Sequence, residues 1–177
     1  MKILIISQYF WPENFRINDF IPELIKKGHD VQILTGQPNY PSGKIFSEFK
    51  KDPKAFAFYQ NAKIHRVPII SRGSHPVRLL LNYISFIISG SCFGPWKLRN
   101  FQPDLIFVYE PSPITVGIPA VLLGKLKNAP IVFWALDLWP ETLEAVGGIK
   151  SKTVLWGIEK VVRFIYNNCS IILGQSK

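Results

Sequence analysis

Cysteine is scarce in this sequence, and its two copies form no pattern that indicates disulfides or a metal site. The 177 residues contain only Cys92 and Cys169, whereas small secreted domains depend on several paired cysteines and zinc sites need closely spaced ones. We therefore expect two reduced, mostly buried thiols in a cytosolic protein. A chain of this length can bury a stable core as one domain without such cross-links.

Long hydrophobic runs are also missing. The apolar run in Met1–Ile6 is four residues long, too short for the core of a signal peptide. The most apolar stretch, Leu79 to Phe93, is interrupted by asparagine, serines and glycine, and it falls short of the roughly 20 residues that a spanning helix needs. The sequence therefore predicts a domain that does not cross a membrane.

Acidic residues are absent from one long segment, Pro53 to Pro103. The chain has a net charge of +9, and this segment carries seven of its 21 basic residues. Aromatic residues are interleaved with them. Such a surface suits an anionic partner, either lipid headgroups or nucleic acid. The alternative is an ordinary basic face whose aromatic side chains point into the core. The basic residues are Lys54, Lys63, Arg66, Arg72, Arg78, Lys97 and Arg99.

Glycine is lacking from the loop that follows the first expected strand, Ser7 to Arg16. A dinucleotide fingerprint needs glycines there for the tight turn and for close approach of the pyrophosphate. The loop therefore argues against a nicotinamide or flavin dehydrogenase. The sequence also contains no P-loop, no His/Cys metal cluster and no defensible Ser-His-Asp pattern.

What is present is an alternation of buried strands and helices. We expect strands at 2–6, 30–35, 104–109, 130–134 and 169–173, and an antiparallel hairpin from 56–59 and 63–67 around Gln60-Asn61. Helices are expected at 17–25, 76–99 (one or a pair), 113–126, 143–146 and 152–167. Pro22 requires the first helix either to begin near Asp19 or to be kinked. A long loop without secondary structure is expected at 36–53.

This alternation predicts an α/β fold with a doubly wound, mostly parallel sheet. In such sheets ligands bind beyond the carboxyl ends of the strands. Four segments should therefore converge on one site: Ser7 to Asn18, Thr35 to Lys44, Tyr109 to Pro113, and Ala135 to Glu141.

Five short motifs occur in order at these places: Gln8–Glu13, Gly28–Val31, Pro38–Gly43, Glu110–Pro113 and Asp137–Glu141. With them the chain resembles the family 4 retaining glycosyltransferases of the GT-B fold, most of all those that extend lipid-linked sugars for bacterial surface polysaccharides. The resemblance covers essentially the whole chain.

The resemblance implies a Rossmann-like N-terminal domain that binds the acceptor, a polyprenyl-diphosphate-linked sugar. A second domain would bind the nucleotide-sugar donor and carry a Glu-x7-Glu pair; no two glutamates here are eight apart. We therefore expect residues 1–177 to be one domain without the donor-binding domain, inactive in transfer alone. No metal or other cofactor and no nucleic acid partner are implied, and the location is cytoplasmic, on the inner face of the cytoplasmic membrane.

Asp137 is the candidate catalytic residue, because a carboxylate there could orient the attacking hydroxyl; it could equally be an N-cap. The candidate substrate-binding residues are Asn14, Phe15, Arg16, Asn18, Lys44, Glu110, Trp139 and Glu141. Asn14-Phe15 stands where many family members have Gly-Gly, and Leu136 where many have a polar residue. Arg16 and Asn18 would then approach a phosphate.

Plainer interpretations stay open for several of these residues. Arg16 could pair with Glu13, Lys44 could be a solvated lysine, and Glu141 could be a first-turn helix charge. Tyr9, Phe10 and Trp11 could line the acceptor path or cap the sheet.

The resemblance implies a front-face retaining mechanism, in which the protein mainly positions substrates and stabilises charge. Two other functions remain: a non-catalytic sugar- or nucleotide-binding domain, and a basic nucleic-acid-binding module, which no recognition signature supports.

Overall fold

Seven strands form one sheet in the computed structural model, which describes residues 1–139 and 151–174. The order across the sheet is β3-β4-β2-β1-β5-β6-β7, and every neighbouring pair is parallel except β3 with β4. The strands are β1 (Lys2–Ile6), β2 (Asp30–Gly36), β3 (Phe58–Tyr59), β4 (Ala62–Val67), β5 (Leu105–Glu110), β6 (Ile131–Ala135) and β7 (Ile171–Gly174).

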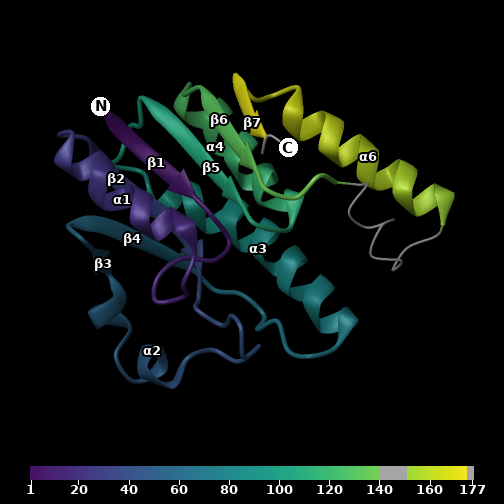
Figure 1. Cartoon of the computed structure of the whole chain (residues 1–177), viewed down its shortest axis with the longest axis horizontal. Helices are drawn as coiled ribbons and strands as arrows, with labels where there is room; N and C mark the ends of the chain where they lie inside the picture. Colours follow the sequence, from purple (N-terminus) through teal and green to yellow (C-terminus); the bar gives the residue numbers. More distant parts are fainter. Residues whose placement is uncertain (140–150, 175–177) are drawn as a thin grey trace.

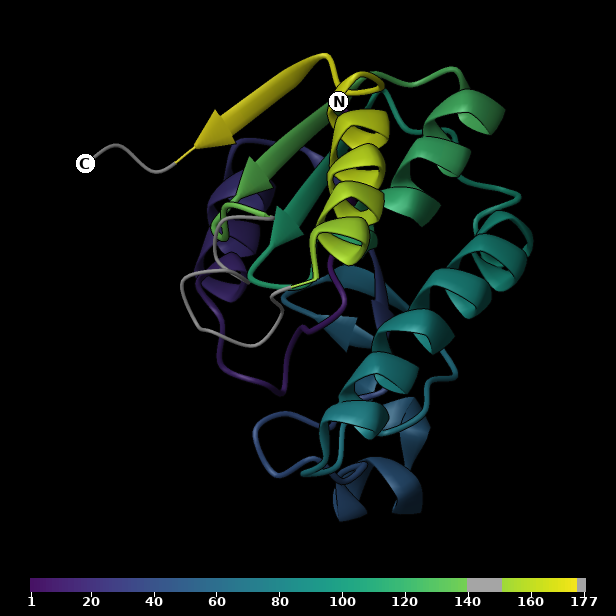
Figure 2. The same ribbon diagram turned by 90° about the vertical axis from the view of Figure 1, so that its right-hand side faces the viewer.

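Helices cover both faces of the sheet, as Figures 1 and 2 show. The helix α1 (Arg16–Lys26) lies on one face, and α3 (Pro76–Lys97), α4 (Gly117–Lys127) and α6 (Lys152–Tyr166) lie on the other. Short elements fill the connections: α2 (Ser47–Lys51), η1 (Pro53–Phe56) and η2 (Ile114–Val116). The predicted doubly wound, mostly parallel α/β fold is confirmed.

Two apolar clusters, one on each face, hold these layers together. β1 contributes to both, because Leu4 and Ile6 point to the side of α3, α4 and α6 while Ile3 and Ile5 point to α1. This is the arrangement that a continuous apolar strand in a covered parallel sheet requires. The sequence run at 2–6 was therefore sufficient to place the central strand.

Several element boundaries differ from the sequence prediction. α1 begins at Arg16 rather than near Asp19, so Pro22 lies inside the helix. The 36–53 connection contains α2, and the helix predicted at 113–126 begins as the 3-10 turn η2 before α4. The last strand is shifted to Ile171–Gly174. The predicted turn at 143–146 lies outside the described residues.

The hairpin prediction was right about the turn and incomplete about the strand. Gln60 and Asn61 both have positive φ, 48° and 71°, as a two-residue hairpin turn demands. β4, however, pairs in parallel with β2 as well as antiparallel with β3. Its carboxyl end at Val67 therefore opens onto the same edge of the sheet as the ends of β1, β2, β5 and β6.

The single-helix alternative for residues 76–99 is confirmed in α3, whereas the prediction of two mostly buried cysteines was wrong. α3 is a continuous helix of 22 residues that runs through the interrupting serines and glycine, and by length and composition it could span a membrane, although 28% of its most apolar window is buried in the protein. It packs on β2, β4 and α4. Cys92, on this helix, is exposed, and Cys169 is half-buried.

Candidate functional site

The loops after β1 and β2 are tied together by one buried carboxylate, Glu13. Its Oε1 accepts hydrogen bonds from the backbone N–H groups of Asn39 (2.7 Å) and Tyr40 (2.6 Å), and its Oε2 accepts one from Phe10 N–H (3.0 Å). Burial raises the pKa of Glu13 to about 7 against the pull of these donors. Two of the four predicted strand ends therefore meet through this residue.

Arg66, near the end of β4, holds the same loops from the other side. Its guanidinium donates to the carbonyl oxygens of Gly36 (2.9 Å) and Trp11, and it lies over the ring of Phe49. Burial lowers its pKa to about 10, and the charge of Glu13 opposes that shift. Arg66 is thus a structural cation rather than part of a basic surface.

An aromatic layer lies above these loops. The rings of Tyr9, Phe15 and Tyr40 contact one another at centroid distances of 5.2 to 5.8 Å. Arg72, from the segment after β4, lies over the Tyr40 ring at 5.3 Å and hydrogen-bonds the Tyr9 side chain. None of the ion pairs between described residues includes Arg72. Its charge is therefore held by a ring and a phenol rather than by a carboxylate.

The ends of β5 and β6 bring two carboxylates together. Glu110 is fully buried, and its Oε2 accepts a hydrogen bond from Asp137 N–H at 3.3 Å, while its Oε1 has no partner within the described part of the chain. Burial raises the pKa of Glu110 to about 8, and the charge of Asp137 adds to the rise. Glu110 is therefore mainly protonated at neutral pH, whereas Asp137 is half-buried and within reach of solvent.

Tyr83 of α3 joins the two halves of the site. Its pKa is raised by burial and by the charges of Asp137 and Glu110, and it is lowered by Arg72 and by a hydrogen bond with Ser112. Arg72, Tyr83, Ser112 and Asp137 are all half-buried. We call these four residues the site cluster. It brings a cation and a carboxylate within electrostatic reach of a phenol.

A buried polar network fixes α3 against the loop after β1. Asn82 Oδ1 accepts hydrogen bonds from Gln8 Nε2 (2.6 Å) and from the Tyr9 hydroxyl (2.9 Å). Its Nδ2 donates to the carbonyl oxygen of Ile70 at 2.6 Å. Asn82 precedes Tyr83, so this network sets the position of the phenol in the site cluster.

The structure brings some predicted site residues together and leaves others apart. Phe15, Glu110 and Asp137 belong to the assembly just described, and Arg16 adjoins it, because its backbone N–H bonds the Tyr109 side chain. Glu110 is fully buried and accepts a hydrogen bond from Asp137 N–H, so it positions Asp137, and its contact with a ligand stays a prediction.

The remaining predicted residues have other surroundings. Asn14 is exposed. Asn18 is buried, and its Nδ2 donates to the Glu13 carbonyl oxygen (2.7 Å), so it supports the loop. Lys44 is exposed and its backbone bonds Ser42. Trp139 packs against the core cluster beneath α3, α4 and α6. Glu141 lies outside the described residues.

Sequence reasoning missed Arg72, Tyr83 and the supporting pair Glu13 and Asn82. The signal for Tyr83 and Asn82 lies in α3, where an asparagine and a tyrosine interrupt an apolar run. Arg72 was missed because β4 was taken as half of a hairpin, so that its carboxyl end was not counted among the strand ends.

No protein-family model matches the chain, and no curated protein sequence matches it. Solved structures do. The crystal structure of Arabidopsis thaliana UGT89C1 complexed with UDP has a TM-score of 0.54 at 9% identity and covers 99% of this chain. Acinetobacter baumannii MurG gives 0.48 at 12% identity over 99%, and the glycosyltransferase VinC in complex with dTDP gives 0.35 at 12% over 86%.

The likeness to UGT89C1 establishes the fold: this chain is a Rossmann-like domain of the GT-B type. The chain spans 44% of UGT89C1, 42% of MurG and 40% of VinC.

Proposed function

We propose that this chain is the acceptor-binding domain of a retaining glycosyltransferase, which transfers a sugar from a nucleotide-sugar to a lipid-linked saccharide. One observation carries the proposal: a half-buried carboxylate, Asp137, and a half-buried cation without a carboxylate partner, Arg72, both follow strand ends and both interact with Tyr83 of α3. That edge is where open α/β sheets bind ligands.

The two charges suit the two parts of such an acceptor. A guanidinium binds phosphate oxygens with directed hydrogen bonds, so Arg72 fits the diphosphate. A carboxylate accepts hydrogen bonds from sugar hydroxyls, so Asp137 fits the saccharide and can orient the hydroxyl that attacks. The rings of Phe15 and Tyr40 offer apolar faces beside them.

The donor and the chemistry complete the proposal. A nucleotide-sugar would be held by a second lobe facing this edge, outside the present sequence. The acceptor hydroxyl would attack the anomeric carbon from the side on which the diphosphate leaves, and the leaving phosphate would take its proton. The role of this domain is then to fix the acceptor, and family 4 membership and bacterial surface polysaccharide synthesis are parts of the same proposal.

We further propose that the basic segment Pro53 to Pro103 rests on an anionic membrane surface, from the cytoplasmic side. Its supporting observation is a stripe of exposed apolar side chains on α3, with cations at both ends of the helix. The stripe includes Val77, Leu80, Ile84 and Ile88, and it reaches Trp96, beside which Lys97 and Arg99 lie.

Calorimetric binding tests the proposed function. A short-chain prenyl-diphosphate-linked monosaccharide should bind the chain, whereas a nucleotide-sugar should bind at least tenfold more weakly. Asp137→Asn should weaken acceptor binding about tenfold, because it removes a charged hydrogen-bond acceptor. Glu159→Gln, an exposed carboxylate on α6, is the matched control and should change nothing.

The reverse preference would contradict the proposal. If the folded chain binds nucleotide-sugars and not the acceptor, it is a donor- or nucleotide-binding domain instead.

A further inference from the structure

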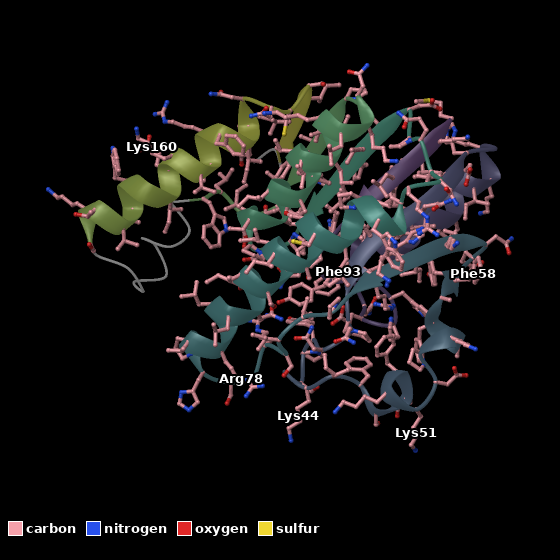
Figure 3. All side chains as sticks on the ribbon, turned by 180° about the vertical axis from the view of Figure 1, so that it is seen from behind. Lys44, Lys51, Phe58, Arg78, Phe93 and Lys160 are labelled. Carbon is pink, nitrogen blue, oxygen red and sulfur yellow. The ribbon has the colours of Figure 1, made fainter. Side chains whose placement is uncertain are left out.

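An apolar groove lies beside α3, on a different side of the helix from the site cluster. It has a volume of about 530 Å³ and lies between the segment 68–70 and the helix residues Leu81, Ile84, Ile88 and Phe93. Figure 3, which views the molecule from behind, places Phe93 partway along α3 and Arg78 near its start. The volume is in the range of about 300 to 1,000 Å³ that is usual for small-molecule sites.

The side chains that line the groove are exposed to water although they are aliphatic or aromatic. Ile88 is 58% exposed, Phe93 45% and Ile70 42%. A contiguous apolar surface of this kind marks a binding site for an apolar partner. The next question is which partner fits.

The backbone groups of Ile70 in the groove wall are already used, whereas the buried Ser89 Oγ has no partner among the described residues. Ile70 N–H donates to Ser85 Oγ (2.9 Å), and Ile70 carbonyl oxygen accepts from Asn82 Nδ2 (2.6 Å). An extended peptide that added to this segment would find both backbone groups of Ile70 occupied, and main-chain hydrogen bonds supply most of the affinity in that mode of recognition. A hydrocarbon chain needs no such partners.

Charge near the groove indicates what the hydrocarbon is attached to. Arg72 and Arg78 follow the groove segment 68–70 along the chain, and the sequence from Pro53 to Pro103 holds no acidic residue. The Arg78 guanidinium donates only weak, long hydrogen bonds, to Ser71 carbonyl oxygen at 3.4 Å and Ser71 Oγ at 3.3 Å. Cations in this position favour an anionic headgroup.

The groove and the site cluster share two elements of the chain. Ile70 lines the groove and Arg72, two residues later, contacts the aromatic layer. On α3, Leu81 and Ile84 line the groove while Asn82 and Tyr83 face the site. One amphiphile could therefore place its chain in the groove and its headgroup by the arginines.

We propose that this groove binds the hydrocarbon chain of a prenyl diphosphate, with Arg72 and Arg78 taking the diphosphate. This proposal deepens the proposed function. It rests on that function in one respect, because it assigns the bound hydrocarbon to the lipid part of the sugar acceptor. The binding itself needs neither the sugar nor the donor.

Farnesyl diphosphate, below its micelle concentration and without vesicles, is the probe. Calorimetry with the 177-residue protein should show that farnesyl diphosphate binds at least tenfold more tightly than inorganic diphosphate, because the farnesyl group adds apolar contact. Ile88→Asn should weaken it about fivefold. Leu126→Asn is the matched control, because Leu126 is 59% exposed on α4 and lies outside the groove, and it should leave the affinity unchanged.

A second measurement locates the probe. Methyl resonances of Ile70, Ile84 and Ile88 should shift with farnesyl diphosphate and not with inorganic diphosphate. The proposal would be overturned if both variants lost the same affinity for farnesyl diphosphate, or if the two probes bound equally well. It would also be overturned if the methyl resonances of the groove did not shift. A dimer that covers this face and is not dissociated by the probe would overturn it as well.

The outcomes also separate this inference from the proposed function. Suppose that farnesyl diphosphate shifts the methyl resonances of the groove, but Asp137→Asn does not change the affinity for a lipid-linked sugar. The groove proposal then holds, and the acceptor role of the site cluster is contradicted. If the affinity for the lipid-linked sugar depends on Asp137 but the methyl resonances of the groove do not shift, only the groove proposal is contradicted.

Discussion

Glu13 and Glu110 are both buried carboxyls at the edge of the sheet, and their partners give them different roles. Glu13 accepts three backbone hydrogen bonds and joins two loops. Glu110 accepts one through Oε2 and leaves Oε1 without a partner among the described residues. The first is a structural group, and the second tunes the electrostatics around Asp137.

Replacing Glu13 should destabilise the loops. In Glu13→Gln an NH2 group replaces one acceptor oxygen, so at least one backbone N–H is left unpaired in a buried site. We expect a loss of about 1 to 3 kcal/mol in the free energy of unfolding, measured by urea denaturation. Glu23→Gln, in an exposed ion pair, should leave the urea midpoint close to that of the wild type. Equal losses would contradict the assigned role.

Glu110 should make stability depend on pH. Its pKa is raised from 4.5 to about 8, so its contribution is fully present below pH 4.5, where both folded and unfolded chains are protonated. Between these values the unfolded chain alone loses the proton, and the free energy of unfolding falls as pH rises. Above pH 8 the fall ends.

Urea midpoints from pH 5 to pH 9 measure this effect. Glu110→Gln should reduce the fall by an amount on the order of 2 kcal/mol, whereas Glu159→Gln should keep the wild-type slope. Some slope should remain, because the pKa of Glu13 is also raised, to about 7. A Glu110→Gln profile as steep as the wild type would show that Glu110 is ionised in the folded chain.

At the scale of elements, a close contact between two loops fixes the position of the segment beside the site. Gly43 and Gly73 approach closely, with Gly73 N–H donating to Gly43 carbonyl oxygen at 2.9 Å. A Cβ at Gly43 would lie 2.6 Å from the Gly73 oxygen, and Gly43 has a φ of 72°. This contact connects the loop after β2 with the segment that carries Arg72.

Gly43→Ala should therefore cost more than the backbone conformation alone. Gly28→Ala is the control, because Gly28 also has a positive φ, 80°, but open space around it. We expect about 1 kcal/mol for Gly28→Ala and about 2 to 3 kcal/mol for Gly43→Ala in denaturant unfolding. Similar costs at both positions would show that the loop crossing is not a tight contact.

The elements themselves were largely predictable, and the reason is periodicity. The continuous apolar run at 2–6 and the spacing from Ile17 to Ile25 each have one packing solution in a covered parallel sheet. The parallel pairing of β4 with β2 was not predictable, because the local turn at Gln60-Asn61 explains the same residues as a hairpin. Asp137 was found from its place after a strand, whereas Tyr83 depends on tertiary packing of α3.

At the scale of the whole molecule, basic charge and exposed apolar surface coincide along α3. This coincidence predicts binding to anionic vesicles that weakens as salt is added. Arg78→Ala should lower vesicle affinity about fivefold, since one basic residue near the surface contributes about 1 kcal/mol. Lys160→Ala is the control on α6, far from Arg78 in Figure 3, and should have little effect.

Vesicle co-sedimentation at low and physiological salt measures both variants. Equal losses would indicate diffuse attraction without an oriented face. Tighter binding to duplex DNA than to anionic vesicles at physiological salt would favour the nucleic-acid module instead.

The location of the acceptor is the central claim. Backbone amide shifts of the isotope-labelled chain, titrated with the short-chain lipid-linked monosaccharide, test it most directly. The account predicts that the largest shifts occur at Arg72, Tyr83, Ser112 and Asp137, four residues from three separate parts of the sequence. Shifts confined to the opposite end of the sheet, around the turn from Asn128 to Pro130, would contradict it.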